Sequence, residues 1–154
     1  MKSTPIALIA IFIWIITISV MGWLFIRGNT ERGNEGRKVI VLHPSERDFV
    51  LTEMRGMLSA TQEILEGASD GDMLRVSKAA GAAGMAGAAD IKPGLIAKLP
   101  LDFKMLGMSV HRDMDVLAKA ATRGASSPEI IKMTSTLLTK CVACHSIWQL
   151  QANK

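Results

Sequence analysis

Residues 127–150 read SPEIIKMTSTLLTKCVACHSIWQL and combine a helix start, an apolar helical pattern and a cysteine motif. Pro128 suits the first turn of a helix, where its missing amide hydrogen costs no hydrogen bond, and Glu129 favours the positive end of the helix dipole. The apolar residues that follow recur at three- and four-residue spacing as far as Cys141 and Cys144. This stretch predicts one long helix, capped by Ser126 or Ser127, that runs into C-x-x-C-H.

The sequence Cys141-Val142-Ala143-Cys144-His145 matches the attachment pattern of c-type haem. Positions i, i+3 and i+4 share one face of a helix, so the two thiols can add to the vinyl groups of a single porphyrin. The imidazole of His145 then reaches the iron as its proximal ligand. The motif therefore predicts one covalently attached haem c.

Two other kinds of site use paired cysteines. A redox-active dithiol normally follows a strand and opens a helix, whereas this pair closes a helix. A zinc site would need a further ligand from His43 or His111, and neither histidine has the paired spacing of a zinc module. We expect His43 to be solvated and His111 to lie at the edge of the helical body.

Three earlier segments also show helical apolar spacing. They are residues 45–67, opened by a capping-box pattern at Ser45 and Asp48, residues 72–89, and residues 103–122. Helix-forming residues dominate the composition and tyrosine is absent. Short connections between such helices favour antiparallel neighbours, so we expect an all-α chain with an antiparallel four-helix bundle and no strands.

The start of the chain is apolar. Residues 5–26 carry no charge and are long enough to cross a bilayer as a helix. A cleavable signal peptide would have a shorter apolar region and a small-residue cleavage site, so we predict a transmembrane signal-anchor over residues 1–27. The charged, glycine-containing residues 28–44 show no apolar period and predict a flexible tether. Residues 45–154 would form the bundle domain.

Residues 45–154 resemble the class II c-type cytochromes, the cytochrome c′ group, most specifically in KCVACHSIWQL at 140–150. The resemblance implies that the first bundle helix presents a residue to the distal haem face, and Met54 falls at that position. A methionine ligand there implies electron transfer, and an open position implies nitric oxide or carbon monoxide binding. Met57 and no ligand at all stay open as alternatives.

An arginine found one turn before the distal residue in this group is absent here, because Val50 occupies its place. We expect Arg47 or Arg55 to be the residue that could pair with a haem propionate. The membrane anchor is a second departure from the group, whose members are usually soluble.

The net charge of +4 is modest and its basic residues are scattered, which does not favour nucleic-acid binding. No arrangement typical of an enzyme active site stands out. The basic residues after the anchor would place the body in the cytoplasm by the positive-inside tendency, whereas covalent haem attachment occurs outside it. We give precedence to the haem motif.

The sequence thus predicts a single-pass protein of the bacterial cytoplasmic membrane whose haem domain faces the periplasm. It would exchange electrons with a membrane oxidoreductase complex or another redox protein, and it could form a homodimer. The alternatives are a gas-binding haem protein and a structural subunit of a membrane complex.

Overall fold

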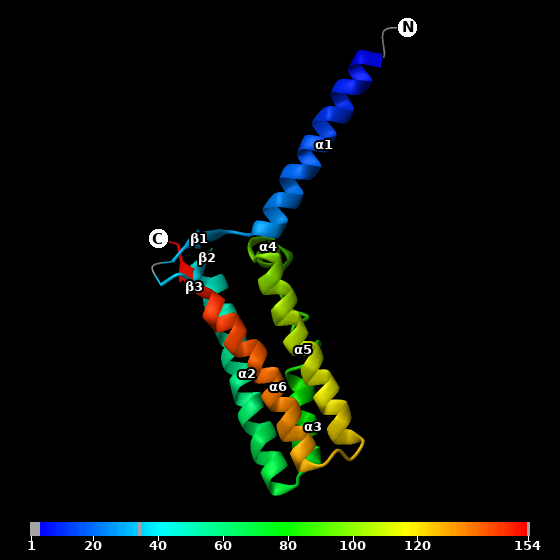
Figure 1. Cartoon of the computed structure of the whole chain (residues 1–154), viewed down its shortest axis with the longest axis vertical. Helices are drawn as coiled ribbons and strands as arrows, with labels where there is room; N and C mark the ends of the chain where they lie inside the picture. The colour runs from blue at the N-terminus through cyan, green and yellow to red at the C-terminus, as the bar shows by residue number, and fades with distance from the viewer. Residues whose placement is uncertain (1–3, 34, 154) are drawn as a thin grey trace.

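The computed structural model describes residues 4–33 and 35–153, and this part of the chain is mostly helical (Figure 1). The helices are α1 (Thr4–Arg27), α2 (Pro44–Asp70), α3 (Met73–Ala82), α4 (Pro93–Lys98), α5 (Leu101–Thr122) and α6 (Ser127–Ile147). The strands are β1 (Thr30–Arg32), β2 (Lys38–Leu42) and β3 (Trp148–Ala152). The first three residues of the predicted anchor, one residue of the predicted tether and the last residue of the predicted bundle lie outside the described residues.

Helix α1 projects away from the rest of the molecule (Figure 1). Its segment Pro5–Arg27 is long and apolar enough to cross a membrane, and its side chains are exposed. This confirms the prediction of one candidate membrane-spanning helix at the start of the chain. At the last turn, the guanidinium of Arg27 lies 5.0 Å from the centre of the Trp23 ring, an arrangement typical of the end of a membrane span.

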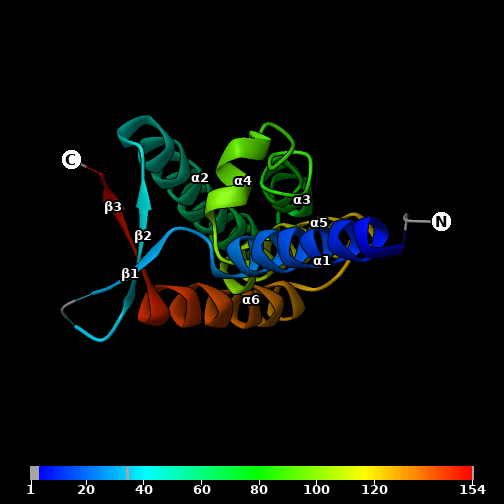
Figure 2. The same cartoon turned by 90° about the horizontal axis from the view of Figure 1, so that it is seen from above.

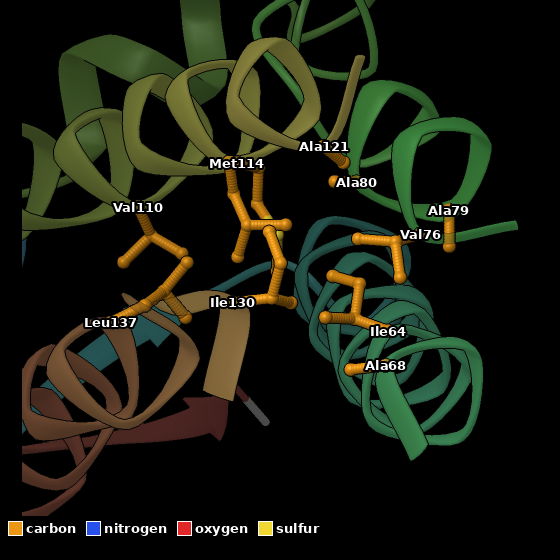
Figure 3. Packing of buried hydrophobic residues seen from close by; sticks show 11 residues of the cluster. Ile64, Ala68, Val76, Ala79, Ala80, Val110, Met114, Ala121, Ile130 and Leu137 are labelled. Atoms are coloured by element: carbon orange, nitrogen blue, oxygen red, sulfur yellow. The ribbon is translucent and has the colours of Figure 1, made fainter. Parts of the chain in front are cut away.

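Helices α2, α3, α5 and α6 share one apolar core (Figure 3). Met114 of α5 and Ile130 of α6 meet at its centre, and Ile64 of α2 contributes from the facing side. All three side chains are almost completely buried. Burial of this apolar surface supplies most of the stability of such a small helical body.

The start of α2 differs from the predicted capping box. His43, not Ser45, is the N-cap: its backbone is extended, and its backbone N–H donates to the carboxylate of Glu46 at 2.9 Å. Pro44 explains this shift of two residues, because proline suits the first helical position. His43 is exposed, as predicted.

The second helix is shorter than predicted. Helix α3 ends at Ala82, and residues 83–89 form successive turns instead of continuing to Ala89. A Cβ at Gly84 would overlap the carboxylate of Asp115 on α5, so a larger residue there would displace that side chain. The connection that follows, predicted as a loop, contains the short helix α4.

The predictions of a flexible tether and of a chain without strands are wrong. Strands β1 and β2 lie in the predicted tether, and β2 pairs in parallel with β3 at the end of the described chain. Figure 2 shows this sheet to one side of the helices. The run Val39–Leu42 is β-branched or apolar and has strong strand propensity, and Ile40 is completely buried.

A second apolar cluster joins the sheet to the helices. Its buried members are Ile40, Leu42, Val50, Leu95, Leu99, Phe103 and Trp148. The rings of Phe103 and Trp148 meet edge to face with their centroids 6.2 Å apart, a favoured aromatic geometry. This cluster lies at the end of the body from which α1 leaves (Figure 1).

Candidate functional site

The two cysteines lie in the last two turns of α6, and both have free thiols. Cys141 is half-buried against the core shared by the four helices, and Cys144 is half-buried against the cluster that contains Trp148. His145 is exposed. Because the helix continues through the motif to Ile147, all three residues lie along one edge of α6, as predicted.

A cavity of about 190 Å³ opens beside this edge. Met54 of α2 lines it together with Cys144 and His145 of α6, so the structure brings the predicted distal and proximal residues to one space. The remaining walls are formed by Arg37, Leu51, Phe103, Trp148, Gln149 and Leu150. Cys141 is not among the lining residues.

The residues present suit a haem in chemical type. Two half-buried thiols and an imidazole stand on one helix, and the facing wall offers Met54, Leu51 and other apolar side chains. The cavity is smaller than the roughly 300–1,000 Å³ of typical pockets for organic ligands. Side chains of α2 and α6 would therefore have to move apart to enclose a macrocycle, or its edge would lie at the surface.

The chemistry of the thiols does not favour a redox-active dithiol. Burial raises the pKa of Cys141 and of Cys144 above the usual value, and the neighbouring Cys141 raises that of Cys144 further. A reactive dithiol needs a lowered pKa, which is typical of cysteines at a helix N-terminus. These thiols lie at the opposite end of their helix.

The structure brings neither of the remaining histidines to the cysteines. His43 caps α2, and the Nδ1 of His111 lies 2.9 Å from the carbonyl oxygen of Ala83. Within residues 4–33 and 35–153, no three His, Cys, Asp or Glu side chains are grouped so that they could hold a metal ion. The zinc interpretation therefore finds no ready ligand set in the described chain.

A second cavity, of about 320 Å³, lies between α2, α5 and the turns after α3. Met57 and His111 line it, with Thr52, Glu53, Gly56, Ala60, Ala82, Ala83 and Gly87. Met57, the alternative distal residue, thus faces a different space from Cys144 and His145. Of the two methionines, only Met54 shares a cavity with the C-x-x-C-H motif.

Arg37 is the lining residue that the sequence interpretation missed. We expected Arg47 or Arg55 to meet a propionate, but neither lines the cavity: Arg47 lies near the carbonyl oxygen of Leu150, and the exposed Arg55 lies near Thr52. Arg37 reaches the cavity because it precedes β2, which pairs with β3. A local sequence signal for that placement does not exist.

Comparison with known proteins gives no match to any family model, any curated protein or any solved structure. We therefore infer function from the residues of the site.

Proposed function

We propose that the chain is a membrane-anchored class II c-type cytochrome with one haem c, held through Cys141 and Cys144 and ligated by His145. In this proposal it transfers electrons to or from a membrane oxidoreductase on the periplasmic side of the bacterial cytoplasmic membrane. The observation that carries the proposal is the meeting of Cys144 and His145 with Met54 across one cavity. A C-x-x-C-H sequence without an adjoining cavity and a methionine on its facing wall would give the proposal less support.

The helical core supports the assignment of a four-helix bundle. Helices α2, α3, α5 and α6 all contribute buried side chains to one cluster, and short turns separate α2 from α3 and α5 from α6. Bundles of this kind place cofactors between facing helices. Here the facing helices would be α2 and α6.

The residues around the motif would orient the group and limit its contact with water. A bound haem supplies a one-electron couple whose potential rises with methionine and histidine ligation. Phe103 and Trp148 form an apolar wall beside Cys144. Arg37 lines the cavity and pairs with the exposed carboxylate of Glu35 at 2.7 Å; it would exchange this partner for a propionate.

The proposed orientation in the membrane rests on the haem motif. The basic residues after α1 would instead favour a cytoplasmic body by the positive-inside tendency. Of the basic residues Arg27, Arg32, Arg37 and Lys38 at and after the end of α1, the last two have local structural roles. Arg37 lines the cavity, and the ammonium group of Lys38 lies 5.0 Å from the centre of the Trp148 ring. Their presence is therefore accounted for without reference to membrane topology.

The proposal is tested by producing the full chain in a bacterium that matures c-type cytochromes. We expect the intact mass to include one porphyrin, a pyridine haemochrome spectrum of the thioether type, and haem staining after denaturing electrophoresis. The Cys141→Ser, Cys144→Ser double variant is the control and should lose all three signals. Unmodified mass in the parent chain would refute the proposal.

Orientation is tested separately with C-terminal reporters. Alkaline phosphatase is active only when exported, whereas green fluorescent protein exported as an unfolded chain is dark. We expect an active phosphatase fusion and a dark fluorescent fusion. The reverse pattern would place the haem motif in the cytoplasm and contradict the proposal.

A further inference from the structure

The junction between α1 and the body is tightly packed at Gly28. This residue has φ +64°, a conformation that favours glycine. A Cβ at Gly28 would lie 2.5 Å from the backbone nitrogen of Pro100 and 2.6 Å from the carbonyl oxygen of Lys98. The chain leaving the membrane helix is therefore in direct backbone contact with the start of α5.

Asn29 connects this point to two other elements. Its backbone N–H donates at 2.7 Å to the carbonyl oxygen of Lys98, the last residue of α4. Its side-chain amide donates to the carbonyl oxygen of Val41 at 2.7 Å, and the N–H of Val41 donates back to the Asn29 carbonyl at 2.9 Å. Three hydrogen bonds thus fix one residue between the end of α4 and β2.

Lys104 of α5 holds the last turns of α1 itself. Its ammonium group donates to the carbonyl oxygen of Phe25 at 3.1 Å and lies 3.5 Å from the centre of the Phe25 ring. Such a cation–π contact strengthens when the cation is partly desolvated. Desolvation by burial lowers the pKa of Lys104, in agreement with this packing.

The same junction is linked to both helices of the proposed haem site. The ammonium group of Lys98 pairs with the carboxylate of Glu46 in the first turn of α2, at 2.6 Å. Strand β2 pairs along its length with β3, which directly follows the C-x-x-C-H helix. Figure 1 shows the sheet and the C-terminal end of α6 at the end of the body from which α1 leaves.

We propose that residues 25–29, with Val41, Lys98 and Lys104, form a rigid joint that holds the C-x-x-C-H end of the body at the membrane surface. Its redox partner then meets the surface around Arg37, His145 and Gln149 from the plane of the same bilayer, and is an integral membrane protein. The statement about the partner rests on the proposed function, whereas the joint itself does not. A freely diffusing carrier would need no such fixed geometry.

The joint is tested on the full chain in lipid nanodiscs with spin labels at Ser19→Cys and Lys78→Cys. We expect a narrow distance distribution between the labels in the parent chain. Gly28→Ala should broaden or displace it, because alanine fits neither the conformation nor the space. Gly22→Ala is the matched control, since a Cβ there meets no atom within 4 Å, and it should change nothing. A broad parent distribution, or equal distributions for both variants, would overturn the joint.

The position of the site end is tested with a lipid that chelates Ni²⁺ at the bilayer surface. A label at the exposed Ser146 should show a strong increase in relaxation when this lipid is added, and a label at the exposed Arg123, at the far end of α5, a weak one. Equal increases would contradict the proposed orientation. Both measurements are made in the Cys141→Ser, Cys144→Ser background, which carries no haem and leaves only the introduced cysteines for labelling, so they succeed or fail independently of the proposed function.

The partner statement is tested with ferrocenium bound to a lipid headgroup in the same nanodisc. Reduced haem iron would give one electron to ferrocenium, leaving ferric iron and ferrocene. We expect Gly28→Ala to slow this reaction relative to Gly22→Ala, while oxidation by water-soluble ferrocenium stays unchanged. If both variants reacted equally fast with the lipid-bound oxidant, the statement that the joint orients the site toward a partner in the same bilayer would be refuted.

Discussion

Lys38, the first residue of β2, pairs in register with Trp148, the first residue of β3, and its ammonium group lies over the Trp148 ring. This contact joins the segment after α1 to the residue three positions beyond His145. Trp148 is also buried against Phe103. One side chain therefore links the sheet, the start of α5 and the C-x-x-C-H helix.

Because Trp148 links these three elements, replacing it should lower the stability of the fold. Truncation of a buried tryptophan removes apolar contacts and leaves a cavity, so Trp148→Ala is expected to lower the free energy of unfolding by about 3–5 kcal/mol. Urea unfolding of the full chain in mild detergent, followed by near-ultraviolet circular dichroism, measures the loss. The control Gln151→Ala changes an exposed side chain on the same strand and should stay within about 0.5 kcal/mol. Similar values for both variants would show that β3 does not pack as described.

Two glycines near the end of α3 should respond in opposite directions to alanine. At Gly84 a Cβ overlaps the Asp115 carboxylate, whose oxygen accepts the N–H of Met85 at 3.1 Å. We expect Gly84→Ala to destabilise the body by about 1–3 kcal/mol through overpacking. At Gly81 the nearest atom is 4.0 Å away, so Gly81→Ala should stabilise the helix by about 0.5–1 kcal/mol. Thermal unfolding of the two variants checks this, and a change of the same sign in both would contradict it.

The helices could be predicted because their signals are local. The apolar period of α5 and α6, the start at Pro128 and the uncharged stretch 5–26 of α1 are all encoded within single segments. The start of α2 was harder, because histidine is not among the preferred capping residues and its role depends on Glu46.

The sheet could not be predicted because it joins the two ends of the described body. Residues 38–42 show strand propensity, but their partner is β3, which the sequence pattern attached to the preceding helix. The lining residue Arg37 follows from that pairing and was missed with it. Met54, Cys144 and His145, which line one cavity, were predicted together because two of them belong to a local motif and the third came from the family resemblance.

The Glu46–Lys98 pair gives a prediction about pH. The hydrogen bond from Lys98, followed by that from the His43 backbone, lowers the pKa of Glu46 in the folded chain. A lowered folded-state pKa means that the charge stabilises the fold above the unfolded-state pKa, and that this contribution is lost as the pH falls through the folded value.

Glu46→Gln keeps the shape of the side chain and removes its charge. It should therefore be less stable than the parent chain at pH 7, and the difference should shrink as the pH falls below the ordinary carboxyl range, about pH 4. Urea midpoints at several pH values measure it, with Glu63→Gln, an exposed position on the same helix, as the control. A difference that is constant with pH would show that the ion pair contributes nothing.

The placement of two methionines in different cavities gives the sharpest prediction about the proposed haem. Met54 shares its cavity with His145, whereas Met57 faces His111 in the other cavity. If electron transfer is the function, the oxidised protein should be low-spin and show the weak long-wavelength methionine-to-iron band. Met54→Ala should abolish that band and open the iron to carbon monoxide, because alanine cannot reach it. Met57→Ala, a matched truncation one turn away on α2, should keep the band. Loss of the band in Met57→Ala alone would assign the ligand to the other cavity. A high-spin parent protein that binds carbon monoxide readily would favour gas binding over electron transfer.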